Sequence, residues 1–439
     1  MTDILIILFH FFKARYLAQA FKTRQELEIW QKKKIAFFIK NNLSNSLFYQ
    51  KYLGKNLSEF PLINKKLMIE NFDQINTQNL KIDQVLAIAK QAEKTRNFLP
   101  MIGEISVGLS SGTSGQTGIF IAKKSERLKW AGIMLAKALP QNILKKYKIA
   151  FFLRANNNLY ETLKKNRLIE FNFFDLSKNF SQHLENLDRY QPNILVAPST
   201  ILKYIALAQE QKKININPEK IFAAAEVLEE FDQKFIEEIF KQKLQQIYQC
   251  CEGFLAITDA KGNLRLNEEY LHIEKEWLDK KSGRFVPIIT DFNRVSQPVI
   301  RYRLDDVLIE DFSINSPFTY LKKIEGRFDD ICYLKNQNGE STPLFADILR
   351  NIFATNLNNF DEYKIIQNSI SEFEIQIKPE INESDKTLIY KAWQSFCFEQ
   401  KCQMPNLIFS KYQQPKFDQK LKRIENKINF YEKNFNHRN

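Results

Sequence analysis

Residues 106–120 are rich in glycine and in small hydroxyl side chains, a combination suited to holding phosphates. The whole chain has only 12 glycines, and four of them fall here, at Gly108, Gly112, Gly115 and Gly118. The glycines are interleaved with hydroxyls at Ser110, Ser111, Thr113, Ser114 and Thr117. Glycines let backbone N–H groups turn toward an anion without interference from a Cβ atom, and the hydroxyls add further donors. The stretch therefore predicts a phosphate-binding loop.

Two common phosphate motifs do not fit this stretch. No Gly-Lys-Ser/Thr closes it, so it is not a Walker A loop, and the glycine spacing is not that of a dinucleotide fingerprint. A flexible linker is the structural alternative. That alternative is disfavoured because the stretch runs directly into the apolar strand predicted over residues 119–122.

The residues after the loop predict the sheet that must position it. Between about 126 and 250, short apolar runs alternate with helical patterns, which is typical of parallel strands covered by helices on both faces. The predicted strands are 149–153, 171–174, 194–197, 221–224 and 246–248. The predicted helices are 158–166, 181–187, 200–211 and 229–243. Ligands of such sheets bind beyond the carboxyl ends of the strands, so we expect Arg154, Asn156, Asn157 and Ser199 to line a substrate pocket.

The flanking segments complete the predicted fold, which is α/β with two domains. A helical lead-in over 1–100 and a small antiparallel β subdomain after Gly253 belong to a large N-terminal domain, 1–328, whose main sheet is parallel and doubly wound. Strands, a helix and a basic, mostly helical tail predict a small C-terminal α+β domain over 329–439.

Composition narrows the possible partners and compartment. Lysine and arginine exceed aspartate and glutamate by 64 to 51, but the lysines are scattered, so nucleic acid is not expected as a partner. Five irregularly spaced cysteines indicate a reducing compartment, and we expect the cytoplasm. Residues 4–12 are apolar but too short to span a bilayer. A packed N-terminal helix is expected there, with peripheral membrane contact as the alternative.

Five ordered segments resemble motifs of the adenylate-forming superfamily, which includes acyl-CoA synthetases. They are the loop 110–118, Ala-Ala-Ala-Glu at 223–226, Tyr-Gln-Cys-Cys-Glu at 248–252, Tyr-Arg-Leu-Asp-Asp at 302–306 and Gly-Arg-Phe-Asp-Asp at 326–330. Thr-Asp at 290–291 and Pro-Val-Ile-Arg-Tyr at 298–302 look most like the phenylacetate-CoA ligase branch. Within that branch the chain resembles relatives of the synthetase that adenylates the deazaflavin coenzyme of methanogens. The resemblance covers most of the chain.

The resemblance implies a role for each matching residue. ATP and AMP would be held by Ser110, Ser111, Gly112, Thr113, Ser114, Gly115, Ala225, Glu226, Tyr248, Asp306 and Arg327. Thr113 would contact the leaving phosphates, and Glu252 would help to hold Mg²⁺ as a hard oxygen ligand. Asp306 would accept the ribose hydroxyls. Asp329 would be the hinge of a C-terminal lid, and Lys420 matches the catalytic lysine of that lid. For Lys420 a solvated helix face remains the alternative.

Several positions depart from the superfamily pattern. Gln116 and Thr117 stand where many relatives carry Lys and Pro, Cys251 replaces a threonine, and Asp305 replaces a glycine. Some phenylacetate-ligase relatives carry a Cys/His zinc site after the glutamate. The corresponding stretch here offers no such ligands, so no zinc is expected.

The expected activity is ATP- and Mg²⁺-dependent adenylation of a small aryl or acyl carboxylate, with release of pyrophosphate. Transfer of the acyl group to CoA, or to the phosphopantetheine of an acyl carrier protein, would follow. Two alternatives stay open. One is adenylation of a phenolic hydroxyl without a thioester step, and the other is a nucleotide-binding protein that has lost turnover. No integral membrane segment is expected.

Overall fold

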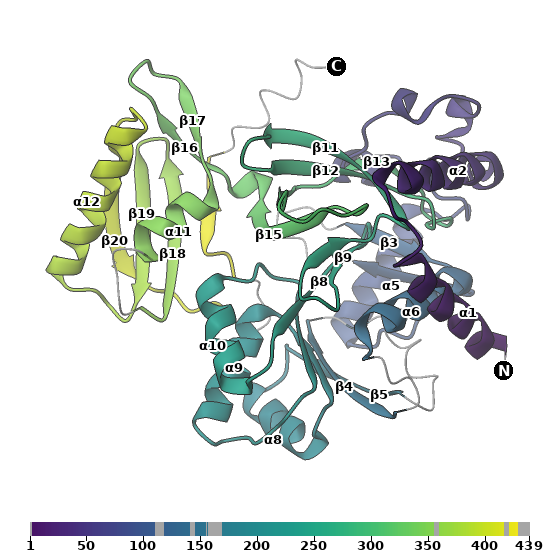
Figure 1. Cartoon of the computed structure of the whole chain (residues 1–439), viewed down its shortest axis with the longest axis horizontal. Coiled ribbons are helices and arrows are strands. Elements are labelled where there is room, and N and C mark those ends of the chain that lie inside the picture. The colour runs from purple at the N-terminus through teal and green to yellow at the C-terminus, as the bar shows by residue number, and fades with distance from the viewer. Residues whose placement is uncertain are drawn as a thin grey trace. The chain divides into compact units, whose positions relative to one another are not determined.

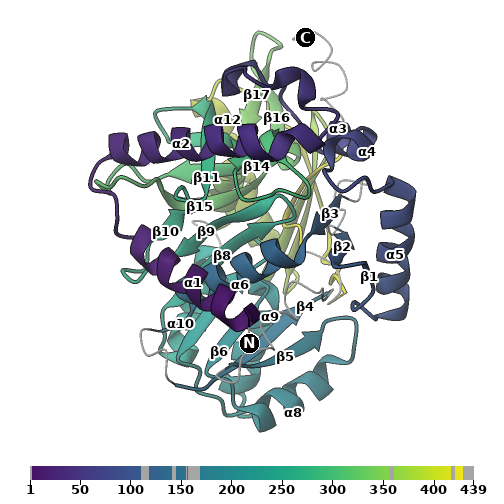
Figure 2. The ribbon, with the colours of Figure 1, turned by 90° about the vertical axis from the view of Figure 1, so that its right-hand side faces the viewer.

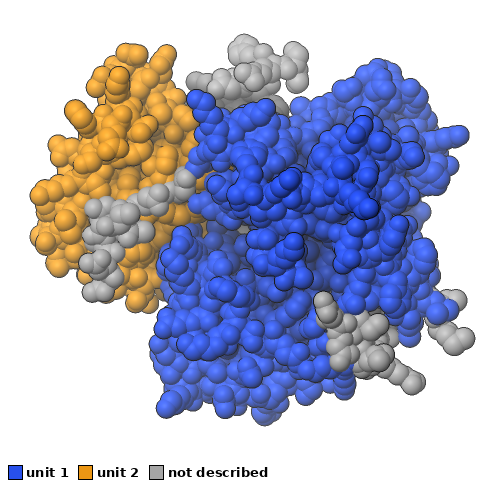
Figure 3. Space-filling model, viewed as in Figure 1, with its two compact units in different colours: residues 1–304, 308–324 blue, residues 305–307, 325–439 orange. Residues whose placement is uncertain are grey.

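The computed structural model describes residues 2–109, 118–140, 145–154, 156, 169–354, 360–416 and 421–428. The chain forms two compact units, coloured separately in Figure 3. Unit 1 contains Met1–Leu304 and Leu308–Ile324, and unit 2 contains Asp305–Val307 and Glu325–Asn439.

A 12-stranded sheet, most of it in unit 1, has the order β11-β12-β14-β15-β10-β9-β8-β7-β6-β4-β5, with β13 paired to β12. Figure 1 labels several strands of this sheet, among them β4, β8 and β12. Its parallel part is β4 (Tyr147–Leu153), β5 (Ile169–Asp175), β6 (Ile194–Ala197), β7 (Lys220–Ala224) and β8 (Leu244–Cys250). The other strands are β9 (Gly253–Thr258), β10 (Leu264–Leu266), β11 (Leu271–Asp279), β12 (Arg284–Asp291), β13 (Val299–Arg303), β14 (Asp306–Glu310) and β15 (Tyr320–Arg327). The pairing of β8 with β9 is antiparallel, so the sheet changes from parallel to antiparallel pairing at that hairpin.

Both faces of the parallel part are covered, because side chains alternate along each buried strand. On β4, Ala150 and Phe152 face a core shared with α8 (Phe180–Tyr190), α9 (Ser199–Glu210) and α10 (Glu230–Phe240). Ile149 and Phe151 face the opposite core, shared with α1 (Thr2–Leu17) and α6 (Lys124–Ala138). This doubly wound arrangement confirms the predicted α/β fold class.

The N-terminal hundred residues are helical, as expected. They form α1, α2 (Arg24–Asn42), α3 (Lys65–Glu70), α4 (Phe72–Ile75) and α5 (Ile82–Thr95). The β1 (Met101–Ile102), β2 (Ile105–Leu109) and β3 (Ile119–Ala122) strands then form a separate three-stranded sheet. None of the described helices is long and apolar enough to cross a membrane.

Unit 2 is an α+β fold around a four-stranded sheet of order β20-β19-β18-β21. Its elements are β16 (Cys332–Lys335), β17 (Ser341–Leu344), α11 (Ala346–Ala354), β18 (Glu362–Ser369), β19 (Glu372–Lys378), α12 (Glu383–Glu399), β20 (Asn406–Lys411) and β21 (Ile424–Asn426). Trp393 of α12 is fully buried against Phe373 of β19, with ring centroids 4.9 Å apart.

The described part of the tail corrects one expectation. Residues 421–428 do not form a helix, because Ile424 pairs in parallel with Ile365 of β18 as the edge strand β21. Arg423, which precedes that strand, is buried and forms an ion pair with Glu362 at 2.8 Å. The Arg423 side chain therefore packs inside unit 2 and does not lie on a solvated helix face.

Candidate functional site

The ends of the glycine-rich loop lie side by side on two strands. β2 and β3 pair in antiparallel fashion, and Leu109 lies opposite Ile119 in that register. The end of β2 and the start of β3 are therefore neighbours in the sheet. The predicted phosphate-binding residues between them lie outside the described residues. These are Ser110, Ser111, Gly112, Thr113, Ser114 and Gly115.

One buried side chain, Gln297, holds the strand that follows the loop. Its Oε1 accepts a hydrogen bond from the backbone N–H of Ile121 at 2.9 Å, and its Nε2 donates to the carbonyl of Ile119 at 3.0 Å. The oxygen and the nitrogen of the Gln297 side-chain amide therefore satisfy two buried backbone groups on the edge of β3 that faces away from β2. Gln297 therefore fixes the position at which the loop rejoins the sheet.

Arg294 links the same strand to the β8–β9 hairpin. Its Nη1 donates to the carbonyl of Cys251 at 2.7 Å, and its Nη2 donates to the carbonyl of Ile121 at 3.4 Å. Cys251 and Glu252 form the turn of that hairpin. A single guanidinium thus ties the predicted metal-ligand turn to the end of the predicted phosphate loop.

Glu126, in the first turn of α6, completes this support. Its carboxylate accepts from the N–H groups of Val295 and Ser296, at 2.6 and 3.1 Å, and from the Ser296 hydroxyl. We call residues 294–297 the brace. It joins β3 and the adjoining α6 to the β8–β9 turn, which lies more than 100 residues further along the chain.

Two titratable groups beside the brace have shifted pKa values. Asp291 is buried, which raises the pKa of its carboxyl group, and Asn293 donates its N–H to Oδ1 at 2.8 Å. Burial lowers the pKa of the Lys129 ammonium to about 8, and the negative charge of Asp291 opposes this shift. A Cβ added at Gly253 would lie 3.4 Å from Asp291 Oδ2, which places this carboxylate next to the Glu252 turn.

The predicted adenine-binding residues lie together at the carboxyl ends of β7 and β8. Ala224 and Ile247 are partners in the parallel register, so the residues that follow them, Ala225 and Tyr248, are neighbours at the sheet edge. Tyr248 is buried. Ala225 has φ of +65°, a left-handed conformation that turns the chain sharply after β7.

Glu226 and Ser199 connect this turn to α9. The Oε2 atom of Glu226 accepts from the N–H and the hydroxyl of Thr200, at 3.1 and 2.7 Å, in the first turn of the helix. A carboxylate at that position is favoured by the helix dipole. Ser199 is buried and donates its hydroxyl to the carbonyl of Val227 at 2.9 Å. The described contacts of both residues therefore support the backbone of the turn.

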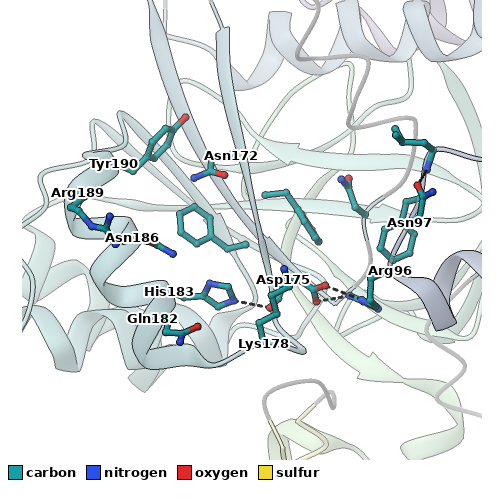
Figure 4. Close-up of a pocket in the computed structure, with 15 residues that line it drawn as sticks. Arg96, Asn97, Asn172, Asp175, Lys178, Gln182, His183, Asn186, Arg189 and Tyr190 are labelled. Atoms are coloured by element: carbon teal, nitrogen blue, oxygen red, sulfur yellow. Dashed lines mark hydrogen bonds and ion pairs between the residues drawn. The ribbon is translucent and has the colours of Figure 1, made fainter.

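A polar pocket of about 790 Å³ lies at the outer edge of the parallel sheet (Figure 4). Asn156, one of the predicted substrate-pocket residues, lines it, together with residues of β5, α8 and the segment 96–99. Arg96 binds both carboxylate oxygens of Asp175, at 2.8 and 2.5 Å, and also donates to the carbonyl of Arg154. The predicted residue Asn157 lies outside the described residues.

The remaining predicted residues belong to unit 2. Asp306 begins β14, Arg327 ends β15, and the exposed Asp329 lies in the short 3₁₀ helix Phe328–Asp330. The N–H of Phe328 donates to the carbonyl of Asp305 at 2.7 Å, which brings the ribose and hinge motifs together within this unit. Lys420 lies outside the described residues.

The neighbouring cation Lys422 is engaged at the hinge motif. Its Nζ lies 3.1 Å from Asp330 Oδ1. Burial raises the pKa of the Asp330 carboxyl, and Lys422 opposes that effect. This ion pair anchors the described end of the tail to the 3₁₀ helix.

Glu252 is the candidate metal ligand in unit 1. Over the described ranges, no three His, Cys, Asp or Glu side chains are grouped so that they could hold a metal ion by themselves. Mg²⁺ in nucleotide enzymes is commonly bound by one or two carboxylates together with substrate phosphates. A single half-buried carboxylate on a braced turn fits that kind of site.

Sequence reasoning missed the brace. Gln297 and Arg294 of the brace, and Glu126 that binds it, belong to none of the recognised motifs, and their partners lie more than 40 residues away. Asp291 was noted only as part of a branch resemblance. The one available signal was a mostly polar segment between two apolar strands, Asn293 to Gln297.

Comparison with known proteins places these features in a familiar fold. No protein-family profile matches the chain. Protein CapK of Staphylococcus aureus is 23% identical over 371 residues, which are 79% of this chain and 77% of CapK. Indoleacetate–lysine synthetase of Pseudomonas savastanoi is 31% identical over 137 residues, which are 30% of this chain and 33% of that enzyme.

Solved structures give a fuller match. A 2-hydroxyisobutyryl-CoA ligase in the postadenylation state, in complex with its acyl-AMP, superposes with a TM-score of 0.63 at 14% identity. The match covers 89% of this chain and 87% of the ligase. The amide bond synthetase McbA of Marinactinospora thermotolerans gives 0.51 at 11% identity, over 72% of this chain and 67% of McbA. The chain therefore has the fold of the adenylate-forming ligases.

Proposed function

We propose that this protein is an ATP- and Mg²⁺-dependent adenylating ligase. It would join a small aryl or acyl carboxylate to AMP, release pyrophosphate, and pass the acyl group to an acceptor. The observation that carries the proposal is the adjacency of Ala225, just after β7, and Tyr248, near the end of β8, in a fold for which an acyl-AMP complex is known. Open α/β sheets bind their ligands at this edge.

Each residue of the proposed site has a chemical task. Tyr248 and Ala225 would enclose the adenine, Asp306 would accept the ribose hydroxyls, and Arg327 would contact the ribose or the phosphates. Glu252 would help to hold Mg²⁺, which neutralises phosphate charge during transfer. The loop 110–117 would hold the departing pyrophosphate through backbone N–H groups and hydroxyls.

The brace would give these groups a fixed geometry. Adenylation depends on holding the carboxylate oxygen in line with the α-phosphorus, so small displacements of the loop or the metal are costly. Gln297 and Arg294 bind β3 and the Glu252 turn to one segment. The carboxylate and the leaving pyrophosphate could then be positioned by a common support.

The acceptor can be a thiol or an amine. The resemblance to the phenylacetate-CoA ligase branch supports CoA or a carrier-protein phosphopantetheine. The 31% identity to indoleacetate–lysine synthetase supports an amine as the second candidate acceptor. The name of that relative indicates that it joins an acid, indoleacetate, to the amine lysine. In both cases the acceptor attacks the acyl carbon of the acyl-AMP, and AMP leaves.

ATP–pyrophosphate exchange across a panel of acids and phenols tests the first step. Exchange that depends on an acid supports the proposal. Exchange only with phenols would support the deazaflavin-type alternative, and nucleotide binding without exchange would support a protein without turnover. Adding CoA, or lysine and other amines, to the best acid then identifies the acceptor from the product formed.

A further inference from the structure

The first helix has two apolar faces, and only one of them is packed. Its inner face lies on α6 and is almost fully buried, with Ile7, Phe11, Ala14 and Leu17 at 3%, 5%, 0% and 3% exposure. Its outer face carries a second apolar row at a spacing of four, three and four residues. This outer stripe is Leu5, Phe9, Phe12 and Tyr16, with 60%, 61%, 54% and 72% exposure.

A helix that is apolar on every side is normally buried on every side. Four large side chains in one row form a contiguous patch, unlike the single apolar residues that are ordinary on protein surfaces. The spacing places all four on one face over about three turns of helix. The outer stripe therefore requires a partner.

The charges around the stripe indicate which partner it is. Lys13 flanks the row, and its Nζ is 5.7 Å from the Phe9 ring centroid. Arg15, on the other flank, lies over the Phe11 ring at 4.5 Å and donates to the carbonyl of Pro140 at 3.1 Å. The one acidic residue of α1, Asp3, is engaged by Lys124 at 3.1 Å. The border of the stripe is therefore positive.

The second helix extends this character. Figure 2 shows α1 and α2 on the same face of unit 1. α2 exposes Ile29 and Phe37 at 46% and 65%. The exposed lysines of α2 are Lys32, Lys33 and Lys40. Its acidic residues are engaged near its start, Glu28 by Arg24 at 3.1 Å and Glu26 by the N–H of Lys22 at 2.7 Å.

We propose that the outer stripe of α1, with the neighbouring face of α2, binds the surface of an anionic lipid bilayer. Helices with large apolar residues on one face and lysines or arginines beside them lie in the headgroup region without crossing the membrane. The apolar rings insert between headgroups, and the cations contact lipid phosphates. A second copy of the chain is the competing occupant of the stripe.

Vesicle sedimentation tests the proposal. The full chain is mixed with vesicles of phosphatidylcholine alone or with added phosphatidylglycerol, at low and high salt. We expect binding to the anionic vesicles only, weakened by salt. The double variant Phe9→Ser/Phe12→Ser should bind at least about tenfold less, because two rings no longer insert.

Two further variants make the test specific. Phe398→Ser is the matched control, since Phe398 is an 85% exposed aromatic residue on unit 2, and its vesicle binding should equal that of the parent. Lys13→Gln/Lys33→Gln should retain the stripe but lose part of the salt-sensitive binding. Circular dichroism and acid-dependent pyrophosphate exchange should be unchanged in Phe9→Ser/Phe12→Ser, which shows that the chain is folded.

Three results would overturn the proposal. They are absence of binding to anionic vesicles, equal binding by the parent and Phe9→Ser/Phe12→Ser, and equal binding to neutral and anionic vesicles. Light scattering during gel filtration measures whether the chain forms a dimer, which is the competing explanation of the stripe. A dimer that the double variant abolishes, without any vesicle binding by the parent, would assign the stripe to a second copy of the chain.

Discussion

Gln297→Ala should separate the support of the phosphate loop from the general stability of unit 1. The substitution removes one acceptor from the N–H of Ile121 and one donor from the carbonyl of Ile119, at 2.9 and 3.0 Å, in a buried location. An unsatisfied buried polar group costs about 1–3 kcal/mol. With two such groups left unpaired, we expect the free energy of unfolding to fall by about 2–6 kcal/mol.

A functional effect should accompany this loss of stability. With β3 released, the loop no longer rejoins the sheet at a fixed point, so the KM for ATP in pyrophosphate exchange should rise about tenfold, equivalent to about 1.4 kcal/mol of binding. Urea unfolding followed by tryptophan fluorescence gives the stability, and exchange at saturating acid gives the KM.

Gln209→Ala is the matched control. The Gln209 side chain also bonds both backbone atoms of one residue, accepting from the N–H of Ile216 at 3.0 Å and donating to its carbonyl at 3.2 Å. It lies on α9, away from the brace. The control should lose stability while its KM for ATP stays within about twofold of the parent. If both variants raise the KM equally, or neither does, the brace does not support nucleotide binding.

Four further predictions test other parts of the site. Glu252→Gln should lower exchange by about a hundredfold or more and weaken the Mg²⁺ dependence, because an amide is a poorer ligand than a carboxylate; an unchanged Mg²⁺ titration would remove Glu252 from the metal site. Asp306→Ala should weaken ATP and AMP binding in calorimetry by about tenfold, since charge-assisted bonds to the ribose are lost, and equal affinities would place the ribose elsewhere. Lys129 has a folded pKa of about 8 against an ordinary 10.5, so the unfolded chain binds the extra proton between these values and stability should rise with pH across that window. Lys129→Met should reduce the rise in urea-unfolding experiments, and an identical pH profile would contradict the shift. Asp329→Pro should impair exchange and acyl transfer unequally, whereas Lys420→Ala should impair exchange alone; equal losses in both steps for both variants would exclude a moving lid.

Local patterns were sufficient to predict the parallel sheet. Continuous apolar runs such as the one at β4 arise because both faces of a central strand are buried, and this composition is visible in the sequence. The resemblance to the adenylate-forming superfamily then implied that Ala225 and Tyr248 would both contact the adenine. The register of β7 against β8 makes these two residues neighbours.

Features that depend on distant partners could not be predicted in this way. The tail segment at Ile424 has no strong strand pattern of its own, and it is extended because β18 offers it an open edge. Gln297 binds β3 across 176 residues, so nothing near it in the sequence signals the contact. The first helix, α1, was expected to pack against the protein. The spacing of its apolar residues did not reveal that a second apolar face of this helix would stay exposed.

Transfer of oxygen-18 from a labelled acid tests adenylation most directly. When a carboxylate oxygen attacks the α-phosphorus of ATP and the acceptor later releases AMP, one carboxylate oxygen remains on the AMP phosphate. Turnover of the best acid, labelled in both carboxylate oxygens, should therefore give AMP with one oxygen-18 atom and unlabelled pyrophosphate in mass spectrometry. Unlabelled AMP, or label in inorganic phosphate with formation of ADP, would contradict an acyl-adenylate route.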